Sequence, residues 1–508
     1  MTSCIRHLNS TAAERILLTS TMKRAPVWAW LLAVWAWLGC SQAVAQLTNR
    51  TLYSLVEGSF LIDDCLICGR PTIMQPLRGT FELVPVQITP PYSKYLIRDV
   101  NFVAGSGTSL ERRITGSGTY VRFEEFALLQ DMDLAVDIKD NFTNRPAFFT
   151  NESRTVSQPF PLIQVNLKQT NGTLMQTFSL QLFAAPVREI WFSTTRGFTS
   201  TNRSAPTNQI TAGDLLSNRG RVVKRNIDLV GRLGVMPIVY DLGLDAVQVS
   251  RRGEILFSLP KNVFSETLGN IQHGDLLSSR GAIVRRNQEL LAAFHPVNTA
   301  DAGLDGFRIL PNGEILFSIQ SNVVTAAGTT LTRGSILSDQ GRIFLSQWQL
   351  MMNFRPSVTN YDFGLDAFHI LPSGEIWFSV EEGFLDARLG QIQAGDLLSN
   401  FGYRVFSNAD LLAAFAPADT SVDYGLDALY VVTDTVPPKA TPRIIQQTRN
   451  AGGMHLEWDG VGEVFQLEHA LDLQGPWVSC SPILPEISGD AACNVSAESA
   501  GFFRLRQW

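Results

Sequence analysis

The stretch GLDGFRILPNGEILFS, residues 303–318, decides the fold because two near-copies of it occur in the same chain. The copies are GLDAVQVSRRGEILFS, which starts at Gly243, and GLDAFHILPSGEIWFS, which starts at Gly364. In each copy an apolar run is followed by a turn that contains glycine and then by a second apolar run. This order predicts two antiparallel strands joined by a tight turn.

The repeat extends over residues 184–434 and has four units of about 61 residues. A second motif, GDLLS or a variant of it, precedes another glycine turn and another apolar run. A helix-compatible segment such as NQELLAAF follows, with Asn as its predicted cap and Pro after its end. Each unit is therefore predicted to contain four strands and a short helix. The GLD aspartates recur at Asp245, Asp305, Asp366 and Asp427, and the EI glutamates at Glu189, Glu254, Glu314 and Glu375.

Units of this kind bury their sheets by packing on one another, either around a ring as a propeller or in a row as a solenoid. The first unit begins at REIWFS, residues 188–193, without a preceding GLD strand. The last unit ends on GLDALYVV, residues 425–432, without a following EI strand. In a ring, this last strand would complete the first sheet and leave no exposed sheet end. The offset favours a closed four-bladed propeller over an open solenoid.

A four-unit ring whose blades begin at an Asp-Ala strand, continue through a glycine-turn hairpin and end in a short helix resembles the hemopexin-type propeller. The resemblance covers residues 184–434 only, and GDLLS replaces the aromatic-rich middle strand of that family. The resemblance implies a binding platform with a cation, such as calcium, in its central channel. The positions that match the cation site are Asp245, Asp305, Asp366 and Asp427.

The two other regions also read as β-structure, so the fold class is all-β. Residues 46–183 contain no repeat, and segments such as MDLAVDI alternate apolar with polar residues, which predicts a β-sandwich or barrel. Asn171-Gly172 predicts the type I′ turn of a hairpin in this region. Residues 435–508 begin with the Pro-rich linker TVPPKATP and continue as short strands around Trp458. This last pattern resembles a small fibronectin type III-like β-sandwich.

The N-terminus predicts export. Lys23 and Arg24 precede an apolar run, and small residues at 43 and 45 form a cleavage signature, so residues 1–45 read as a signal peptide, with Met22 as a possible start. Attachment of a lipid at Cys40 is the alternative. No later stretch is long and apolar enough to span a bilayer. We expect a secreted, cell-surface or periplasmic protein.

Export places the cysteines in an oxidising compartment, where they tend to pair. Cys65 with Cys68, and Cys480 with Cys493, form two local pairs. Both pairs are predicted to be disulfides. Redox or metal chemistry is the alternative for the lone CxxC of the first pair.

The repeated acids have two interpretations. Because every unit carries the GLD aspartates and EI glutamates, hydrogen bonds within turns come first, and a cation held by four convergent strands comes second. The GD aspartates Asp214, Asp275 and Asp396 read as turn residues, since Ser335 replaces the fourth. His273, His295 and His369 occur at non-equivalent places, which predicts surface or satisfied side chains. The basic stretches 219–225 and 250–286 read as a solvated face or as a patch for acidic polysaccharide.

Composition narrows the function. A net charge of -6 gives no basic footprint for nucleic acid or anionic membrane. No catalytic residue and no bound cofactor are predicted. We expect a non-enzymatic binding or structural protein that uses the propeller as a platform for an extracellular protein or polysaccharide. The alternative is an extracellular carbohydrate-active enzyme with its site in the propeller funnel, which an asymmetric pair of buried acids at one end of the ring would favour.

Overall fold

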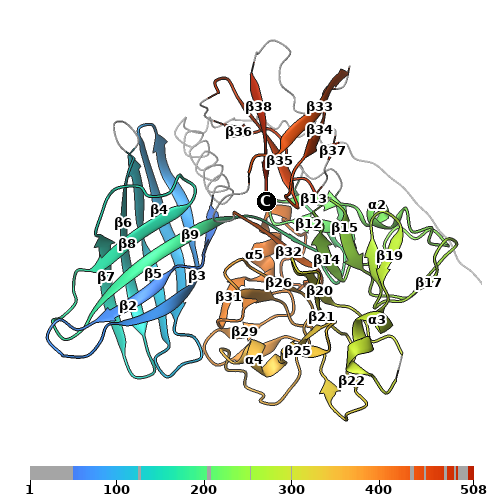
Figure 1. Cartoon of the computed structure of the whole chain (residues 1–508), viewed down its shortest axis with the longest axis horizontal. Coiled ribbons are helices and arrows are strands. Elements are labelled where there is room, and N and C mark those ends of the chain that lie inside the picture. The colour runs from blue at the N-terminus through green and yellow to red at the C-terminus, as the bar shows by residue number, and fades with distance from the viewer. Residues whose placement is uncertain are drawn as a thin grey trace, which may run out of the picture. The chain divides into compact units, whose positions relative to one another are not determined.

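The N-terminal strands form one antiparallel ladder in the computed structural model (Figure 1). From β3 to β9 each strand pairs with the next, while β1 and β2 pair with β3 on one side and with β9 on the other. The ladder of hydrogen bonds therefore returns to the strand where it began. The strands are β1 (Thr51–Leu55), β2 (Phe60–Asp64), β3 (Ile73–Thr89), β4 (Tyr92–Ala104), β5 (Arg112–Phe123), β6 (Leu129–Lys139), β7 (Asn144–Asn151), β8 (Ile163–Gln169) and β9 (Thr177–Phe192).

The structure describes residue 50 onward, and Asn49–Trp508 form one compact unit. The predicted signal peptide and Cys40 lie outside the described residues. Within the described part, no helix is both long enough and apolar enough to cross a membrane. The further gaps in the description are residues 124–127, 203–207, 252, 299, 435–439, 451–452, 474–476, 486–487 and 490–500.

The alternation read in MDLAVDI is the alternation of burial along β6. Met132, Leu134, Val136 and Ile138 are buried in the core of the N-terminal strands, and the residues between them face outward. The predicted hairpin is also present, since β8 pairs antiparallel with β9. Its reversal differs from the prediction, because mutual backbone hydrogen bonds join Thr173 and Gln176 instead of a two-residue Asn-Gly turn.

Asn171 has a different role from the predicted one. Its Oδ1 accepts a hydrogen bond from the backbone N–H of Phe148 at 3.0 Å, and its Nδ2 donates to the carbonyl of Pro146 at 3.0 Å. The side chain thus ties the hairpin loop to the neighbouring strand β7. The Asn-Gly dipeptide was a misleading turn signal because a cross-strand contact uses the asparagine.

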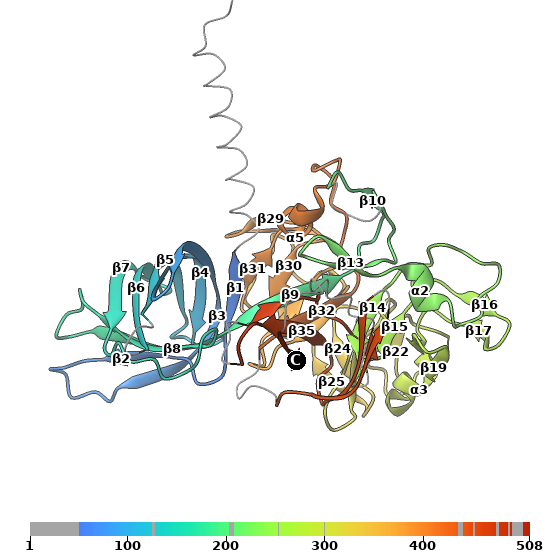
Figure 2. The same ribbon diagram turned by 90° about the horizontal axis from the view of Figure 1, so that it is seen from above.

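Strand β9 crosses the expected domain boundary at residues 183–184. Its first half pairs with β8, β1 and β2, and its second half pairs with β12 and β32 of the repeat region. Figures 1 and 2 show β9 running from the N-terminal strands into the repeats. The two regions share a strand rather than a linker.

The repeats form four antiparallel sheets of four strands each. The prediction for the last strand is confirmed, since β32 pairs with β9 and completes the first sheet. The sheets are, in strand order, β32 (Leu429–Thr433), β9, β12 (Leu215–Ser217) and β13 (Arg221–Lys224); β14 (Ala246–Val249), β15 (Ile255–Ser258), β18 (Leu276–Ser278) and β19 (Ala282–Arg285); β20 (Gly306–Ile309), β21 (Ile315–Ser318), β24 (Ile336–Ser338) and β25 (Arg342–Leu345); and β26 (Phe368–Ile370), β27 (Ile376–Phe378), β30 (Leu397–Ser399) and β31 (Tyr403–Phe406).

Each of four hydrophobic clusters contains buried side chains from two consecutive sheets. In the first cluster, Trp191 of the first sheet packs with Phe257 of the second sheet. Another cluster joins the second sheet to the third, and a third cluster joins the third sheet to the fourth. The fourth cluster joins Trp377 of the last sheet to Phe192 of the first. Strand β14 accordingly lies next to β20 and β32, and β26 lies next to the same two strands. The order of packing is circular.

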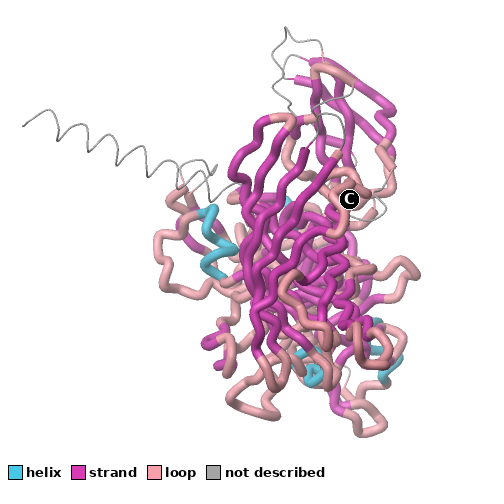
Figure 3. Tube along the Cα trace, turned by 90° about the vertical axis from the view of Figure 1, so that its left-hand side faces the viewer, coloured by secondary structure: helices cyan, strands magenta, loops and turns pink. Residues whose placement is uncertain are grey.

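A short helix follows the fourth strand of each unit as predicted, and helices are few in this strand-rich chain (Figure 3). The expected cap residue is different: Asn226 is the first helical residue, and Arg225 occupies the cap position. The helices are α2 (Asn226–Val230), α3 (Asn287–Leu291), α4 (Gln347–Met351) and α5 (Asn408–Leu412), with 3-10 turns η1 (Ala292–Phe294) and η2 (Ala413–Phe415).

Each unit also contains a two-stranded hairpin that the sequence patterns did not predict. Its strands are only two or three residues long, so they show no readable alternation. The hairpins are β10 (Phe198–Thr199) with β11 (Gln209–Ile210), β16 (Val263–Ser265) with β17 (Gly269–Ile271), β22 (Val323–Val324) with β23 (Thr330–Leu331), and β28 (Phe384–Asp386) with β29 (Gly390–Ile392).

The C-terminal module consists of two three-stranded antiparallel sheets with a common core. Trp458 is buried against Phe465 at a ring-centroid distance of 5.5 Å, in agreement with its predicted core position. Most of the expected linker, residues 435–439, lies outside the described residues. The strands are β33 (Arg443–Asn450), β34 (Gly453–Asp459) and β37 (Ser488–Gly489), and β35 (Phe465–Ala470), β36 (Val478–Ser479) and β38 (Phe502–Gln507).

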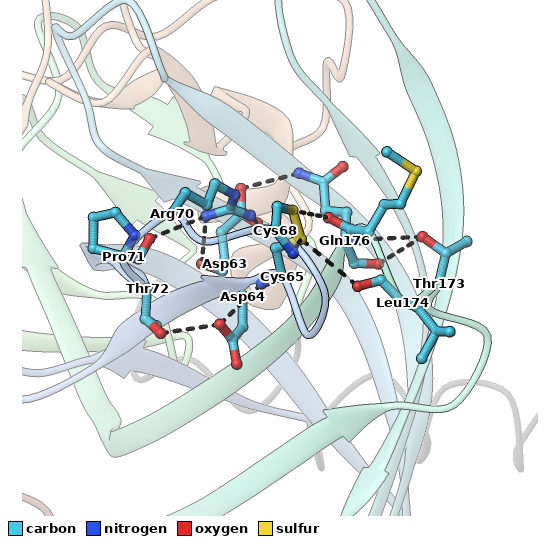
Figure 4. The surroundings of a disulfide bond; sticks show 11 residues. Asp63, Asp64, Cys65, Cys68, Arg70, Pro71, Thr72, Thr173, Leu174 and Gln176 are labelled. Carbon is cyan, nitrogen blue, oxygen red and sulfur yellow. Dashed lines mark hydrogen bonds and ion pairs between the residues drawn. A yellow bond between two sulfur atoms is a disulfide. The ribbon is translucent and has the colours of Figure 1, made fainter.

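Cys65 and Cys68 form the predicted disulfide (Figure 4). Beside it, the buried carboxylate of Asp63 makes ion pairs of 2.6 Å with Arg70 and Arg112. These contacts surround the CxxC with a fixed polar network at the end of β2. Cys480 follows β36, and its predicted partner Cys493 lies outside the described residues.

Candidate functional site

The GD aspartates have the turn role that the sequence predicts. Oδ1 of Asp214 accepts the backbone N–H of Asn226 at 3.0 Å, and its Oδ2 accepts Thr211 N–H at 3.0 Å. Asp275 and Asp396 make the same two contacts in their own units. In the third unit the hydroxyl of Ser335 accepts the N–H that begins the helix, which explains why serine is tolerated there.

The EI glutamates stabilise their own sheets. Glu375 accepts hydrogen bonds from Trp377, Ser399 and Tyr403, all within its sheet. Glu189 accepts from Trp191, from Ser217 and from the guanidinium of Arg221. Because hydrogen bonds from the surrounding sheet engage them, the EI glutamates have a structural role.

A second set of repeated aspartates makes the turn contacts that were expected of the GLD residues. Asp241 accepts the N–H of Gly243 at 3.0 Å and of Gly213 at 2.8 Å, which ties the GLD turn to the GD turn. The equivalent residues in the other units are Asp301, Asp362 and Asp423. These aspartates recur in the sequence at intervals of 60, 61 and 61 residues, a signal that lies just before the GLD motif.

The GLD aspartates differ from the expectation of turn hydrogen bonds. In the described part of the chain none of their carboxyl groups accepts such a bond, and the Oδ2 atoms of Asp245 and Asp305 are buried without any hydrogen-bond partner. Asp427 is also buried, while Asp366 is half-buried. Each GLD aspartate lies one or two residues before the innermost strand of a sheet, and these strands are neighbours around the circle. The four carboxyl groups therefore converge at one end of the innermost strands, which we call the acidic end.

Burial and proximity to one another raise the pKa values of these acids. Burial raises the pKa of Asp427 to about 7. Burial, followed by the charges of the other GLD carboxyl groups, raises the pKa of Asp366 well above the ordinary value. Glu381 adds negative charge at the same end, and Arg333 pairs with it at 2.5 Å. This acidic end contains more carboxyl groups than cations to balance them.

The geometry for a metal ion is incomplete. Within the residues that the structure describes, no group of three or more His, Cys, Asp or Glu side chains is arranged to hold one. The unpartnered carboxyl oxygens would suit a hard cation such as calcium, but they do not form a ready coordination sphere. A cation at Asp245, Asp305, Asp366 and Asp427 stays a prediction.

A cavity of about 510 Å³ lies at the other end of the innermost strands, and we call it the axial cavity. Three residues after each GLD aspartate, roughly 10 Å along the strand, the four units place different side chains. All four line the axial cavity, together with residues of the C-terminal module. They are Gln248, Arg308, His369 and Tyr430.

Arg308 and Tyr430 meet a carboxylate of the C-terminal module in this cavity. The Tyr430 hydroxyl donates to Oε2 of Glu463 at 2.6 Å, and Nη2 of Arg308 lies 3.8 Å from the same oxygen. The Nη1 atom of Arg308 is buried and has no hydrogen-bond partner among the described residues. Burial raises the pKa of Tyr430 well above its ordinary value, so the phenol is neutral.

His369 is a buried residue of the cavity wall with a hydrogen bond at one ring nitrogen, so it agrees with the satisfied alternative of the prediction and not with the surface alternative. Its Nδ1 accepts the N–H of Val431 at 3.4 Å, which leaves the ring proton on Nε2. Burial, followed by the charge of Arg308, lowers the pKa of His369 well below its ordinary value. His273 bonds to Asn262 at 2.9 Å and His295 is exposed, so these two agree with the prediction.

Several residues of the basic stretches serve ion pairs within the repeats. Arg221 pairs with Glu189 at 2.7 Å, Arg225 with Asp214 at 2.5 Å, and Arg286 with Asp275 at 2.6 Å. Arg251 is different, because it is exposed and lines the axial cavity. These stretches are therefore largely structural, with Arg251 at the cavity.

No protein-family model matches this sequence, and none of the curated proteins compared with it gives a match. The evidence for a function therefore comes from the two ends of the four innermost strands. One end is acidic and nearly the same in all four units. The other end is a cavity where the units differ in chemistry.

Proposed function

We propose that the chain is an exported extracellular or cell-surface binding protein whose repeats form a closed four-bladed propeller that serves as an interaction platform. The circular order of the hydrophobic clusters and the pairing of β32 with β9 support the closed ring. The N-terminal ladder, which returns to its first strand, supports a barrel. The common core of the C-terminal sheets supports a fibronectin type III-like sandwich. The N-terminal targeting pattern supports export.

The axial cavity is the observation that carries the binding function. Because each repeat makes the same contacts with its neighbours, a residue that the fold needs is expected in every unit. Positions that differ between units are therefore candidates for a role in binding. The turn and sheet positions of this chain are nearly uniform, but the four cavity positions differ completely. A concave, partly apolar cavity with a few polar groups is the usual form of a binding site.

The enzyme alternative has weaker support. Glycoside hydrolysis needs two carboxyl groups in different environments on either side of a bond. Glu463 is the only Asp or Glu residue that lines the axial cavity among the described residues. The acidic end has several carboxyl groups, but its four aspartates occupy equivalent positions. We therefore favour binding over catalysis.

The platform can be tested with the purified mature chain, residues 46–508, on an array of immobilised polysaccharides and extracellular proteins. We expect retention on at least one class, without release of soluble fragments from it. Retention on no class would contradict the platform. Release of reducing sugar ends from a retained polysaccharide would favour the enzyme instead.

A further inference from the structure

The four cavity positions are the strongest unassigned feature of the molecule. Two of them contact the backbone of a neighbouring innermost strand. Nδ1 of His369 accepts the N–H of Val431 at 3.4 Å. Gln248 makes two such contacts: its Oε1 accepts the N–H of Ile309 at 2.7 Å, and its Nε2 donates to the carbonyl of Ile309 at 3.4 Å. It thereby links the innermost strands of the second and third sheets. Among the described residues, Arg308 and Tyr430 have no such contact with a backbone group, so the identities of these two residues need another reason.

Two hydrogen-bond donors in the cavity wall have no acceptor among the residues that the structure describes. Nη1 of Arg308 is buried without a partner, which is costly for a charged donor. Nε2 of His369 carries the ring proton, because Nδ1 accepts from Val431. Both side chains line the cavity. A ligand that places acceptor oxygens against them would supply the missing bonds.

The arginines of the lining favour a ligand with a negative charge. Arg251 and Arg308 have cationic side chains, and Glu463 has the one anionic side chain among the described lining residues. His369 is neutral, because burial and Arg308 lower its pKa. The local site for a negative charge is the Nη1 edge of Arg308, which is buried and has no hydrogen-bond partner among the described residues. A guanidinium with a free edge binds a carboxylate well.

The size and the remaining walls of the cavity exclude a bare inorganic anion as the best fit. At about 510 Å³ the cavity is in the range of small organic ligands. Tyr430, Trp508 and Leu371 supply aromatic and apolar surface to the wall. The carboxylate of Glu463 is an acceptor that matches hydroxyl donors. These features together fit a carbon ring with hydroxyl groups and one carboxylate.

We propose that the axial cavity binds a saccharide unit that carries one carboxylate, such as a uronic acid residue of an acidic polysaccharide. Its carboxylate would lie against Arg308 and His369, and its hydroxyl groups would reach Glu463. This inference rests on the proposed function and specifies the class of ligand.

Calorimetric titration of the mature chain with D-glucuronate, D-glucose and inorganic phosphate tests the inference. We expect glucuronate to bind at least about tenfold more tightly than glucose, because only the acid engages the guanidinium. Phosphate is expected to bind more weakly than glucuronate. Equal binding of glucose and glucuronate would overturn the claim that the cavity recognises a carboxylate. Phosphate binding as tight as that of glucuronate would overturn the claim that the ligand is a saccharide.

Variants assign the effect to the cavity. Arg308→Met is expected to weaken glucuronate binding about tenfold, whereas Arg342→Met, at an exposed arginine paired with Glu314, removes the same charge elsewhere and leaves binding unchanged. Arg251→Met at the exposed rim provides a second test that spares the core, with an expected loss of roughly threefold for glucuronate and none for glucose. Full glucuronate binding by both cavity variants would overturn the proposal.

The array separates this inference from the proposed function. Retention of the mature chain on a surface that does not depend on Arg308, combined with no glucuronate binding, would overturn the saccharide site and leave the platform intact. The absence of retention on every surface would contradict the platform itself.

Discussion

Val432 lies opposite Glu189 in the first sheet of the repeats, although the two residues stand at opposite ends of the repeat region. The pairing continues from Leu429 opposite Phe192 and fills the innermost position of that sheet. Without β32, the backbone of β9 would be exposed on one side, and the circle of innermost strands would be open. A single strand thus joins the first and last units.

Removal of residues 425–434 from the mature chain is therefore expected to lower the free energy of unfolding by several kcal/mol, through an exposed sheet edge and lost core contacts. A thermal melt followed by far-UV circular dichroism measures the change. Addition of a synthetic peptide with residues 425–434 should recover part of the loss. An unchanged melting temperature would indicate sheets stacked in a row.

The repeat made much of this architecture predictable from the sequence. The offset between the EI and GLD motifs predicted the pairing of β32 with β9. The strands could be located because the same pattern occurs in four copies. The Asn171-Gly172 turn was mispredicted because a contact from β7 to Asn171 is not local. The axial cavity escaped prediction because Arg308 and Glu463 belong to different modules, and no spacing along the chain relates them. Polar positions that vary between copies were the signal that could have located it.

The acidic end predicts an unusual pH dependence of stability. Burial raises the pKa of Asp427 to about 7 in the folded chain, above its value in the unfolded chain. The folded state then binds more protons, so stability is fully present below the unfolded pKa and is lost as the pH rises through about 7. We expect metal-stripped protein to have a higher melting temperature at pH 5 than at pH 8.

Two variants distinguish the acidic end from general effects of pH. Asp427→Asn should reduce the difference between pH 5 and pH 8, because the titrating group is gone. Asp241 accepts hydrogen bonds from the N–H groups of Gly213 and Gly243. Asp241→Asn should therefore lower stability at both pH values and leave the difference in melting temperature between pH 5 and pH 8 unchanged. An identical pH profile for Asp427→Asn and the wild type would assign the dependence to other groups.

Calcium should act on the same carboxyl groups. Asp427, whose pKa burial raises to about 7, loses its proton between pH 5 and pH 8, and a bound cation would then stabilise the folded state by mass action. We expect calcium to raise the melting temperature of the metal-stripped chain at pH 8 and to have little effect at pH 5. Magnesium is a suitable comparison, because it dehydrates less readily. An unchanged melting temperature on addition of calcium at pH 8 would contradict the prediction that the acidic end binds a cation.

The disulfide between Cys65 and Cys68 gives a prediction for the exported protein. Maleimide labelling of the unfolded mature chain, followed by peptide mapping, should detect no thiol at either position. Cys65→Ser should expose Cys68 to the reagent and serves as the positive control. Complete labelling of both residues in freshly exported wild-type protein would support the redox or metal alternative.

The asparagines that begin the short helices should be among the most sensitive polar residues of the repeats. The amide of Asn408 is buried, accepts the N–H of Tyr424 at 3.0 Å, and donates to the carbonyls of Gly425 and Gly395. Asn408→Ala leaves these three backbone groups without a partner, which should cost about 2–3 kcal/mol. The third unit offers a matched control, since Gln347 occupies the equivalent position and its side-chain amide donates to Tyr361.

Gln347→Ala should therefore cost less, about 1 kcal/mol. Urea unfolding of both variants measures the difference, and equal slopes would show that the folded states remain comparable. If the two substitutions cost the same, the buried Asn bridge would not be the contact that holds the GLD turn to the GD turn. A larger loss for Asn408→Ala would identify this bridge as the reason that three of the four units place asparagine at the first helical residue.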